Sequence, residues 1–108
     1  MSIESIAILG GTGDLGGGLA RQWSRAGYKI LIGSRTEEKG KAAADALLGE
    51  FPDLNVSGHE NLAAAEAADL VVLTVPFDHQ QSTLATVKPA LTGKILIDVT
   101  VPLKPPKV

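Results

Sequence analysis

The sequence predicts an α/β fold with a doubly wound parallel sheet of five strands in the spatial order 3-2-1-4-5. One observation on the sequence and one general rule on strand connections predict it. Short apolar runs alternate regularly with segments of helical periodicity, which is typical of parallel sheets covered by helices on both faces. Each crossover between parallel strands is expected to be right-handed, and that handedness sets the strand order.

The first strand, helix and second strand are predicted from the first third of the chain. Residues 6–9 are all apolar and end in glycines, which indicates a strand buried on both faces. Residues 14–26 form a predicted helix that stops at Gly27. Its apolar positions at helical spacing are Leu15, Leu19, Trp23 and Ala26. Trp23 is therefore assigned to the core, and residues 29–32 to the second strand.

The middle of the chain carries weaker signals. Thr36 is a predicted cap for an alanine-rich helix that runs to about residue 48. Residues 55–57 suggest a short third strand, and Asn61 is predicted to cap a short helix over residues 62–67.

The last elements are clearer until the chain reaches its end. Residues 70–75 are the best buried strand, ended by Pro76. A helix is predicted over residues 78–88 and a fifth strand over residues 95–97. The proline-rich residues 101–108 fit neither a helix nor a central strand, so we expect an exit segment or linker and a truncated chain.

Composition excludes several classes of protein. A chain of 108 residues with 44% hydrophobic and 20% charged residues fits one globular domain. Its net charge of −2 gives no reason to expect nucleic acid or an anionic membrane as partner. Without cysteine there is no disulfide or thiolate chemistry, and His59 and His79 do not make a metal site. With no signal peptide or spanning segment, we expect a cytoplasmic protein.

A glycine-rich segment at residues 11–16 fits the pattern G-x-G-x-x-G. It follows a predicted strand and opens a predicted helix, which is the context of a Rossmann dinucleotide fold. Gly11 permits the tight turn, Gly13 lets the backbone approach a pyrophosphate, and Gly16 lets the helix pack closely on the sheet. The free amides at the helix start favour the anionic phosphates.

The same glycines allow a second interpretation. Gly10, Gly13 and Gly16 also fit G-x-x-G-x-x-G, the spacing of short-chain dehydrogenases. Those enzymes usually use a tyrosine followed four residues later by lysine, whereas the single tyrosine here, Tyr28, is followed at that distance by Ile32. An ordinary short-chain dehydrogenase is therefore excluded, and an atypical one stays open.

The end of the second strand predicts NADP rather than NAD. NAD-specific folds place an acidic residue there to bind the ribose 2′-hydroxyl, but this chain has Ser34 and Arg35. A guanidinium binds a 2′-phosphate through a bidentate, charge-assisted fork, and Lys39 lies about one helical turn further on. Glu37 and Glu38 are expected to face solvent. For Arg35 alone, a solvated charged turn is an equal alternative.

Together these segments resemble a known family. Residues 10–16, residues 33–35 with Lys39, and residues 74–79 are similar to deazaflavin-dependent NADP oxidoreductases, which pass hydride between NADP(H) and coenzyme F420. Related reductase domains that use flavin share much of this pattern, so the resemblance implies transfer of hydride between NADPH and either coenzyme F420 or a flavin. The family's deazaflavin pocket draws on segments after the fifth strand, so the resemblance implies a chain that is incomplete for turnover.

The resemblance implies a set of cofactor-binding residues, in a domain spanning residues 1–100. The phosphates would be held by Gly11, Thr12, Gly13, Asp14 and Leu15. The 2′-phosphate would be held by Ser34, Arg35 and Lys39. The adenosine-linked ribose or the nicotinamide side of the cleft would be flanked by Val75, Pro76 and Phe77.

No catalytic side chain or metal is expected, because hydride transfer between two redox cofactors depends mainly on alignment and exclusion of water. His79 is a candidate acid or a solvent-facing residue. We expect a second copy of the chain to complete the active site. Two alternatives stay open: an NADP-dependent dehydrogenase of a small carbon substrate that lacks its substrate domain, and a non-catalytic NADP(H) sensor.

Overall fold

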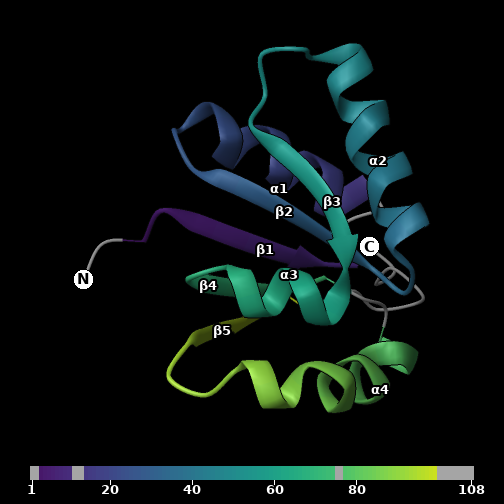
Figure 1. Ribbon diagram of the computed structural model, residues 1–108, viewed down its shortest axis with the longest axis vertical. Helices are drawn as coiled ribbons and strands as arrows, with labels where there is room; N and C mark the ends of the chain where they lie inside the picture. Colours follow the sequence, from purple (N-terminus) through teal and green to yellow (C-terminus); the bar gives the residue numbers. More distant parts are fainter. Residues whose placement is uncertain (1–2, 11–13, 75–76, 100–108) are drawn as a thin grey trace, which may run out of the picture.

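The computed structural model describes residues 3–10, 14–74 and 77–99 (Figure 1). Helices and strands alternate along them. In chain order the elements are β1 Ser5–Leu9, α1 Asp14–Arg25, β2 Lys29–Ser34, α2 Glu37–Glu50, β3 Val56–Glu60, α3 Asn61–Ala67, β4 Leu70–Leu73, α4 Phe77–Val87, the 3₁₀ turn η1 Lys88–Ala90, and β5 Ile95–Asp98. No helix within the described ranges is both long and apolar enough to cross a bilayer.

The strands form a single five-stranded sheet in the order β3-β2-β1-β4-β5, and every neighbouring pair is parallel. This confirms the predicted fold class and strand order. Helices α1 and α2 cover one face of the sheet, and α3 and α4 cover the other (Figure 1). Because all strands run the same way, their carboxyl ends meet at one edge of the sheet.

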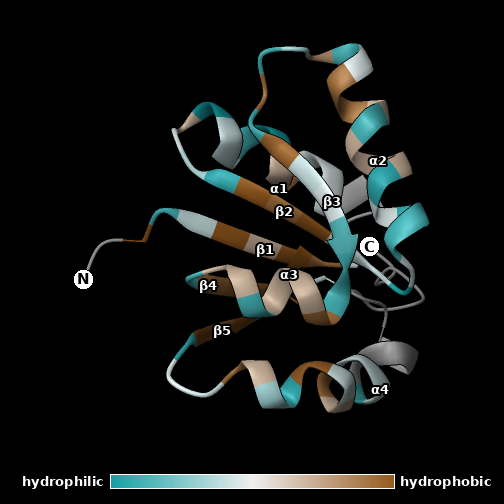
Figure 2. Ribbon diagram, in the orientation of Figure 1, coloured by the Kyte–Doolittle hydropathy of each residue, from teal (hydrophilic) through white to brown (hydrophobic). Residues whose placement is uncertain are grey.

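Alternate residues of the strands fill two separate cores. On the α1–α2 face, Ile8 and Ile32 pack with Ala20 of α1 and Ala44 of α2. The opposite face is built from the neighbouring strand positions and from helices α3 and α4. Burial on both faces explains the apolar runs at residues 6–9, 30–32 and 70–73, which give β1, β2 and β4 their brown stretches in Figure 2. Trp23 packs against the first core, as predicted.

Two predicted helix signals are confirmed. Thr36 has extended backbone angles, φ −130° and ψ 153°, and its Oγ1 accepts a hydrogen bond from the backbone N–H of Lys39 at 3.2 Å. Gly27, just after α1, has a φ of +108°, a backbone conformation that residues with a side chain rarely adopt.

The predicted cap at Asn61 is wrong. Strand β3 continues through Glu60, so the capping position falls on Glu60, which makes no side-chain cap bond, and Asn61 is the first residue of α3. Asn61 is instead buried, with 5% of its surface exposed. Its side chain lies beside the end of β2, because a Cβ placed on Gly33 would lie 2.7 Å from Asn61 Oδ1. Packing against β2 thus replaces capping of the helix amides.

Candidate functional site

The carboxyl edge of the sheet is tied together around the end of β1. The backbone N–H of Gly10 donates to the Gly33 carbonyl at 2.9 Å, which joins β1 to β2. On the other side, the backbone N–H and Oγ1 of Thr74 both donate to the Leu9 carbonyl, at 3.0 and 2.9 Å. Strand β1 therefore has β2 on one side and β4 on the other, and this is the switch point at which α/β sheets bind ligands.

The chain leaves β1 at this switch point and enters α1. Gly10 has a φ of +77°, which a residue with a side chain would adopt only under strain. Helix α1 begins at Asp14 and contains the buried Gly16. A twelve-residue helix that starts at the carboxyl edge presents the positive end of its dipole there.

The exit from β2 is the second part of the site. Ser34 ends the strand and is buried, with 7% of its surface exposed. Arg35 and Lys39 are both exposed, one directly after the strand and the other in the first turn of α2. No carboxylate stands at the end of β2, where an NAD-specific fold would carry one.

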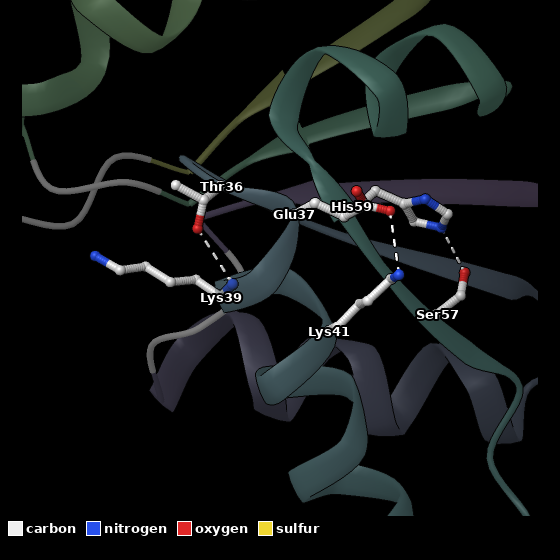
Figure 3. A network of polar contacts seen from close by, with 6 residues as sticks. All are labelled: Thr36, Glu37, Lys39, Lys41, Ser57 and His59. Atoms are coloured by element: carbon white, nitrogen blue, oxygen red, sulfur yellow. Dashed lines mark hydrogen bonds and ion pairs between the residues drawn. The ribbon is translucent and has the colours of Figure 1, made fainter.

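One acidic residue near this exit forms an ion pair on another side of α2. Glu37 and Glu38 are exposed, as predicted. The carboxylate of Glu37 forms an ion pair with Lys41 at 3.3 Å, on a different side of α2 from the Lys39 side chain (Figure 3). A solvated pair of this kind adds little stability, but it leaves the Lys39 side of the helix turn without that carboxylate.

Several predicted contact residues fall outside the described part of the chain. These are Gly11, Thr12, Gly13, Val75 and Pro76. For Asp14, Leu15, Phe77 and His79 the structure describes the helix backbone but not the side chains. The described site therefore comprises the ends of β1, β2 and β4 together with Ser34, Arg35 and Lys39.

His59 forms a hydrogen bond within its own strand and belongs to no group of potential metal ligands among the described residues. His59 lies on β3, and its Nε2 is 2.7 Å from the hydroxyl of Ser57, two residues earlier on the same strand (Figure 3). No group of three potential metal ligands occurs in the described part of the chain. His59 is thus satisfied within its own strand.

At the opposite edge of the sheet, a carboxylate joins two strand starts. Asp69 Oδ2 accepts hydrogen bonds from the backbone N–H groups of Glu4 and Ser5, at 3.0 and 3.3 Å, and the Asp69 N–H donates to Ser5 Oγ at 3.0 Å. The hydrogen bond from the Glu4 backbone, followed by that from Ser5, lowers the pKa of the Asp69 carboxyl below its ordinary value of 3.8. Asp69 thus ties the start of β1 to the start of β4.

Comparison with known proteins decides the family. The family described as NADP oxidoreductase, coenzyme F420-dependent, matches residues 5–102. The chain belongs to this family. The predicted resemblance is therefore confirmed over nearly the whole chain.

Curated relatives agree with this membership. The chain is 51% identical over 100 residues to an F420-dependent NADP reductase of Methanothermobacter marburgensis, an alignment covering 91% of this chain and 45% of that protein. A protein with the same description from Methanocaldococcus jannaschii is 42% identical over 102 residues, with the same coverage of both chains. The chain therefore spans less than half the length of these relatives.

Solved structures support the fold. A lactate dehydrogenase from Cryptosporidium parvum has a TM-score of 0.71 and covers 93% of this chain, which in turn covers 38% of that enzyme, at 16% sequence identity. At that identity the likeness concerns the arrangement of strands and helices alone.

Three glycines that shape this region were not singled out from the sequence as contact-forming residues. Gly33 lies beside Asn61, and Gly40 of α2 lies against Gly58 of β3. A glycine inside a strand often marks a close approach of another backbone, but the predicted third strand ended at residue 57, before Gly58. The sequence pattern therefore gave no signal for this contact.

Proposed function

We propose that this chain is the NADP(H)-binding part of an oxidoreductase that transfers hydride between NADPH and coenzyme F420. Family membership and the description of the relatives as F420-dependent NADP reductases support the proposal. The single observation that carries it is the exit from β2, where Arg35 and Lys39 stand in place of a carboxylate. Two cations beside a strand end suit a doubly charged ester better than a sugar hydroxyl.

The proposed binding roles follow the order of the strands. The pyrophosphate would lie at the start of α1, against the backbone of Gly11, Thr12, Gly13, Asp14 and Leu15. The 2′-phosphate would receive hydrogen bonds from Ser34, Arg35 and Lys39. The ribose or nicotinamide side of the cleft would be flanked by Val75, Pro76 and Phe77.

In this proposal the chain binds and orients the dinucleotide, and no side chain takes up a proton. When bound, the nicotinamide and deazaflavin rings supply the donor and the acceptor of the hydride. Hydrogen bonds of Gly10 and Thr74 join the ends of β1, β2 and β4 at the carboxyl edge, and this arrangement would be the protein's main contribution to a transfer that depends on alignment. The described residues fit this role because the edge is closed by hydrogen bonds and the β2 exit is cationic.

A titration tests the nucleotide part of the proposal. NADPH and NADH are titrated separately into the protein, and binding is followed by nicotinamide fluorescence. If the charged contacts supply roughly 3–4 kcal/mol, NADPH should bind on the order of 10²–10³ times more tightly. Equal affinities for the two nucleotides would refute the assignment.

Two variants assign the preference to the β2 exit. Arg35→Ala should remove most of the NADPH preference, because it removes the guanidinium without touching the core. Lys29→Ala, which removes an exposed cation from the opposite end of the same strand, is the matched control and should retain the preference. Loss of preference in both variants would point to net charge instead.

The acceptor is tested with the longest natural form of the protein. It is mixed with NADPH and oxidised coenzyme F420, and the loss of deazaflavin absorbance is followed, with free flavin as the comparison. Turnover with the deazaflavin supports the proposal. Turnover with flavin alone would contradict the proposed acceptor while leaving NADPH binding intact.

A further inference from the structure

The first turn of α2 lies directly on the backbone of β3. Gly40 is the buried residue of that turn, and a Cβ placed on it would lie 2.7 Å from the backbone nitrogen of His59 and closer still to the His59 carbonyl oxygen. From the other side, a Cβ on Gly58 would overlap the carbonyl group of Gly40 and the backbone nitrogen of Lys41. Real Cβ atoms do not approach other atoms so closely. Helix and strand therefore touch backbone to backbone, with no side chain between them.

The same turn carries the cations of the β2 exit. Lys39 directly precedes Gly40, and its backbone N–H is held by Thr36 Oγ1 (Figure 3). The N–H of Gly40 donates to the Thr36 carbonyl at 3.1 Å, so hydrogen bonds close the turn from Thr36 to Gly40. Arg35 directly precedes Thr36.

Strand β3 is in turn fixed to β2. Gly33 pairs with His59, and Ser34 pairs with Glu60, so the strand beneath Gly40 is in register with the strand that leads to Arg35. The segment with both cations is thus anchored twice, once by the end of β2 and once by the contact of α2 with β3.

We propose that Gly40 and Gly58 are positioning residues for recognition of the 2′-phosphate. Their missing side chains set the height of the first turn of α2 above β3, and that height places Arg35 and Lys39. This inference rests on the proposed function. It also goes beyond it, because it assigns part of the nucleotide preference to two residues outside the proposed nucleotide contacts.

We expect a small displacement of α2 to cause a large loss of NADPH preference, because phosphate recognition depends on the positions of the cations. A methyl group at residue 58 or 40 forces α2 away from β3, since neither backbone can yield as a flexible side chain would. A misplacement of about 1 Å in a positioned group can cost roughly a hundredfold in function. The pyrophosphate region at the start of α1 belongs to a different helix and should be little affected.

Matched alanine substitutions test the proposal in the full chain. Gly58→Ala should lower the ratio of NADPH to NADH affinity by about tenfold or more, with NADH affinity kept within about twofold. Gly40→Ala should behave in the same way. Gly49→Ala is the control, because it lies in the same helix and a Cβ there meets no atom within 4 Å. An unchanged ratio in folded Gly58→Ala protein, or an equal loss for both nucleotides, would overturn the proposal.

A triple substitution separates positioning from general damage. If Gly58 acts through Lys39 and Arg35, then Gly58→Ala should lower the ratio little further in a chain that already carries both Arg35→Ala and Lys39→Ala. A full additional loss in that background would show that the glycine does not act through these cations.

Wild-type protein supplies a test that does not depend on folding of the variants. Backbone hydrogen exchange of Gly40 and Lys41 should slow more with saturating NADP⁺ than with saturating NAD⁺. Only NADP⁺ has a 2′-phosphate that would bind the first turn of α2. Equal exchange with both nucleotides would overturn the proposal. If wild-type protein shows no preference for NADPH at all, the proposed function fails instead, so the two failures are distinguishable.

Discussion

The two edge strands of the sheet are buried in the opposite order from the one that their polarity would suggest. Strand β3 has the more polar sequence, yet Val56 is only 8% exposed and Gly58 is buried beneath α2. Strand β5 is almost wholly apolar, yet Ile95, Leu96 and Ile97 are 56%, 37% and 42% exposed. Figure 2 shows the brown β5 at one edge and the paler β3 at the other. Burial at a sheet edge therefore depends on the element that crosses it.

The means of attachment differ as well. At the β3 edge, two glycines let α2 lie against the strand itself. Next to β5, the Lys94 ammonium donates to the carbonyls of Ala65 and Glu66 at 2.5 and 2.6 Å, and so joins the entry to the strand to the end of α3. In addition to the strand pairing at each edge, α2 lies on β3 by backbone contact, whereas a lysine ammonium on helix carbonyls joins the entry of β5 to α3.

Matched leucine truncations should give the largest difference between the edges. Leu54 lies just before β3 and is 6% exposed, so Leu54→Ala should lower the free energy of unfolding by about 2–5 kcal/mol. Leu96→Ala on β5 should cost less than about 1 kcal/mol, because the side chain is already partly in water. Urea denaturation measures both. Equal costs would mean that β5 is covered in solution.

Glycine substitutions should give effects of opposite sign within α2 and the strand it covers. Gly58→Ala should destabilise the fold by about 1–3 kcal/mol, because it overpacks a backbone contact. Gly49→Ala should stabilise it by about 0.5–1 kcal/mol, because alanine favours a helix and the added methyl meets open space. Denaturant midpoints report both. A neutral Gly58→Ala would show that the helix is not pressed against β3.

Removal of the Lys94 ammonium should have a smaller effect on the β5 edge. Lys94→Met keeps most of the side-chain length but loses the two hydrogen bonds, at a cost of about 1 kcal/mol. Lys88→Met, at an exposed lysine of η1, is the control and should be nearly neutral. Faster exchange of the β5 amides in Lys94→Met alone would locate the loss at that edge.

The smallest effect on stability should come from Asp69. This residue lies at the start of the central strands β1 and β4, between the two edge strands. Because folding lowers its pKa, Asp69 stabilises the protein above pH 3.8, and this contribution is lost as the pH falls through the folded-state value. Asp69→Asn should therefore show a smaller drop in thermal midpoint between pH 7 and pH 3 than wild type. Identical pH profiles for the two proteins would contradict this role.

The sequence alone determined the order of the elements, the strand order and the family. Apolar runs, helical spacing and the turn at Gly10 are local signals, and the handedness of crossovers converts them into one sheet. The missing carboxylate at the end of β2 is also visible without a structure. These features depend only on neighbours along the chain.

Only the tertiary structure decided how the edges are covered. An apolar run such as residues 95–97 indicates that burial would be favourable, but the strand is buried only if another element covers it. Asn61 has the residue type of a cap, yet its side chain packs beside Gly33 because β3 extends further than its pattern indicates. The meeting of Gly40 and Gly58 joins two backbones eighteen positions apart, and no periodicity within either element encodes that contact.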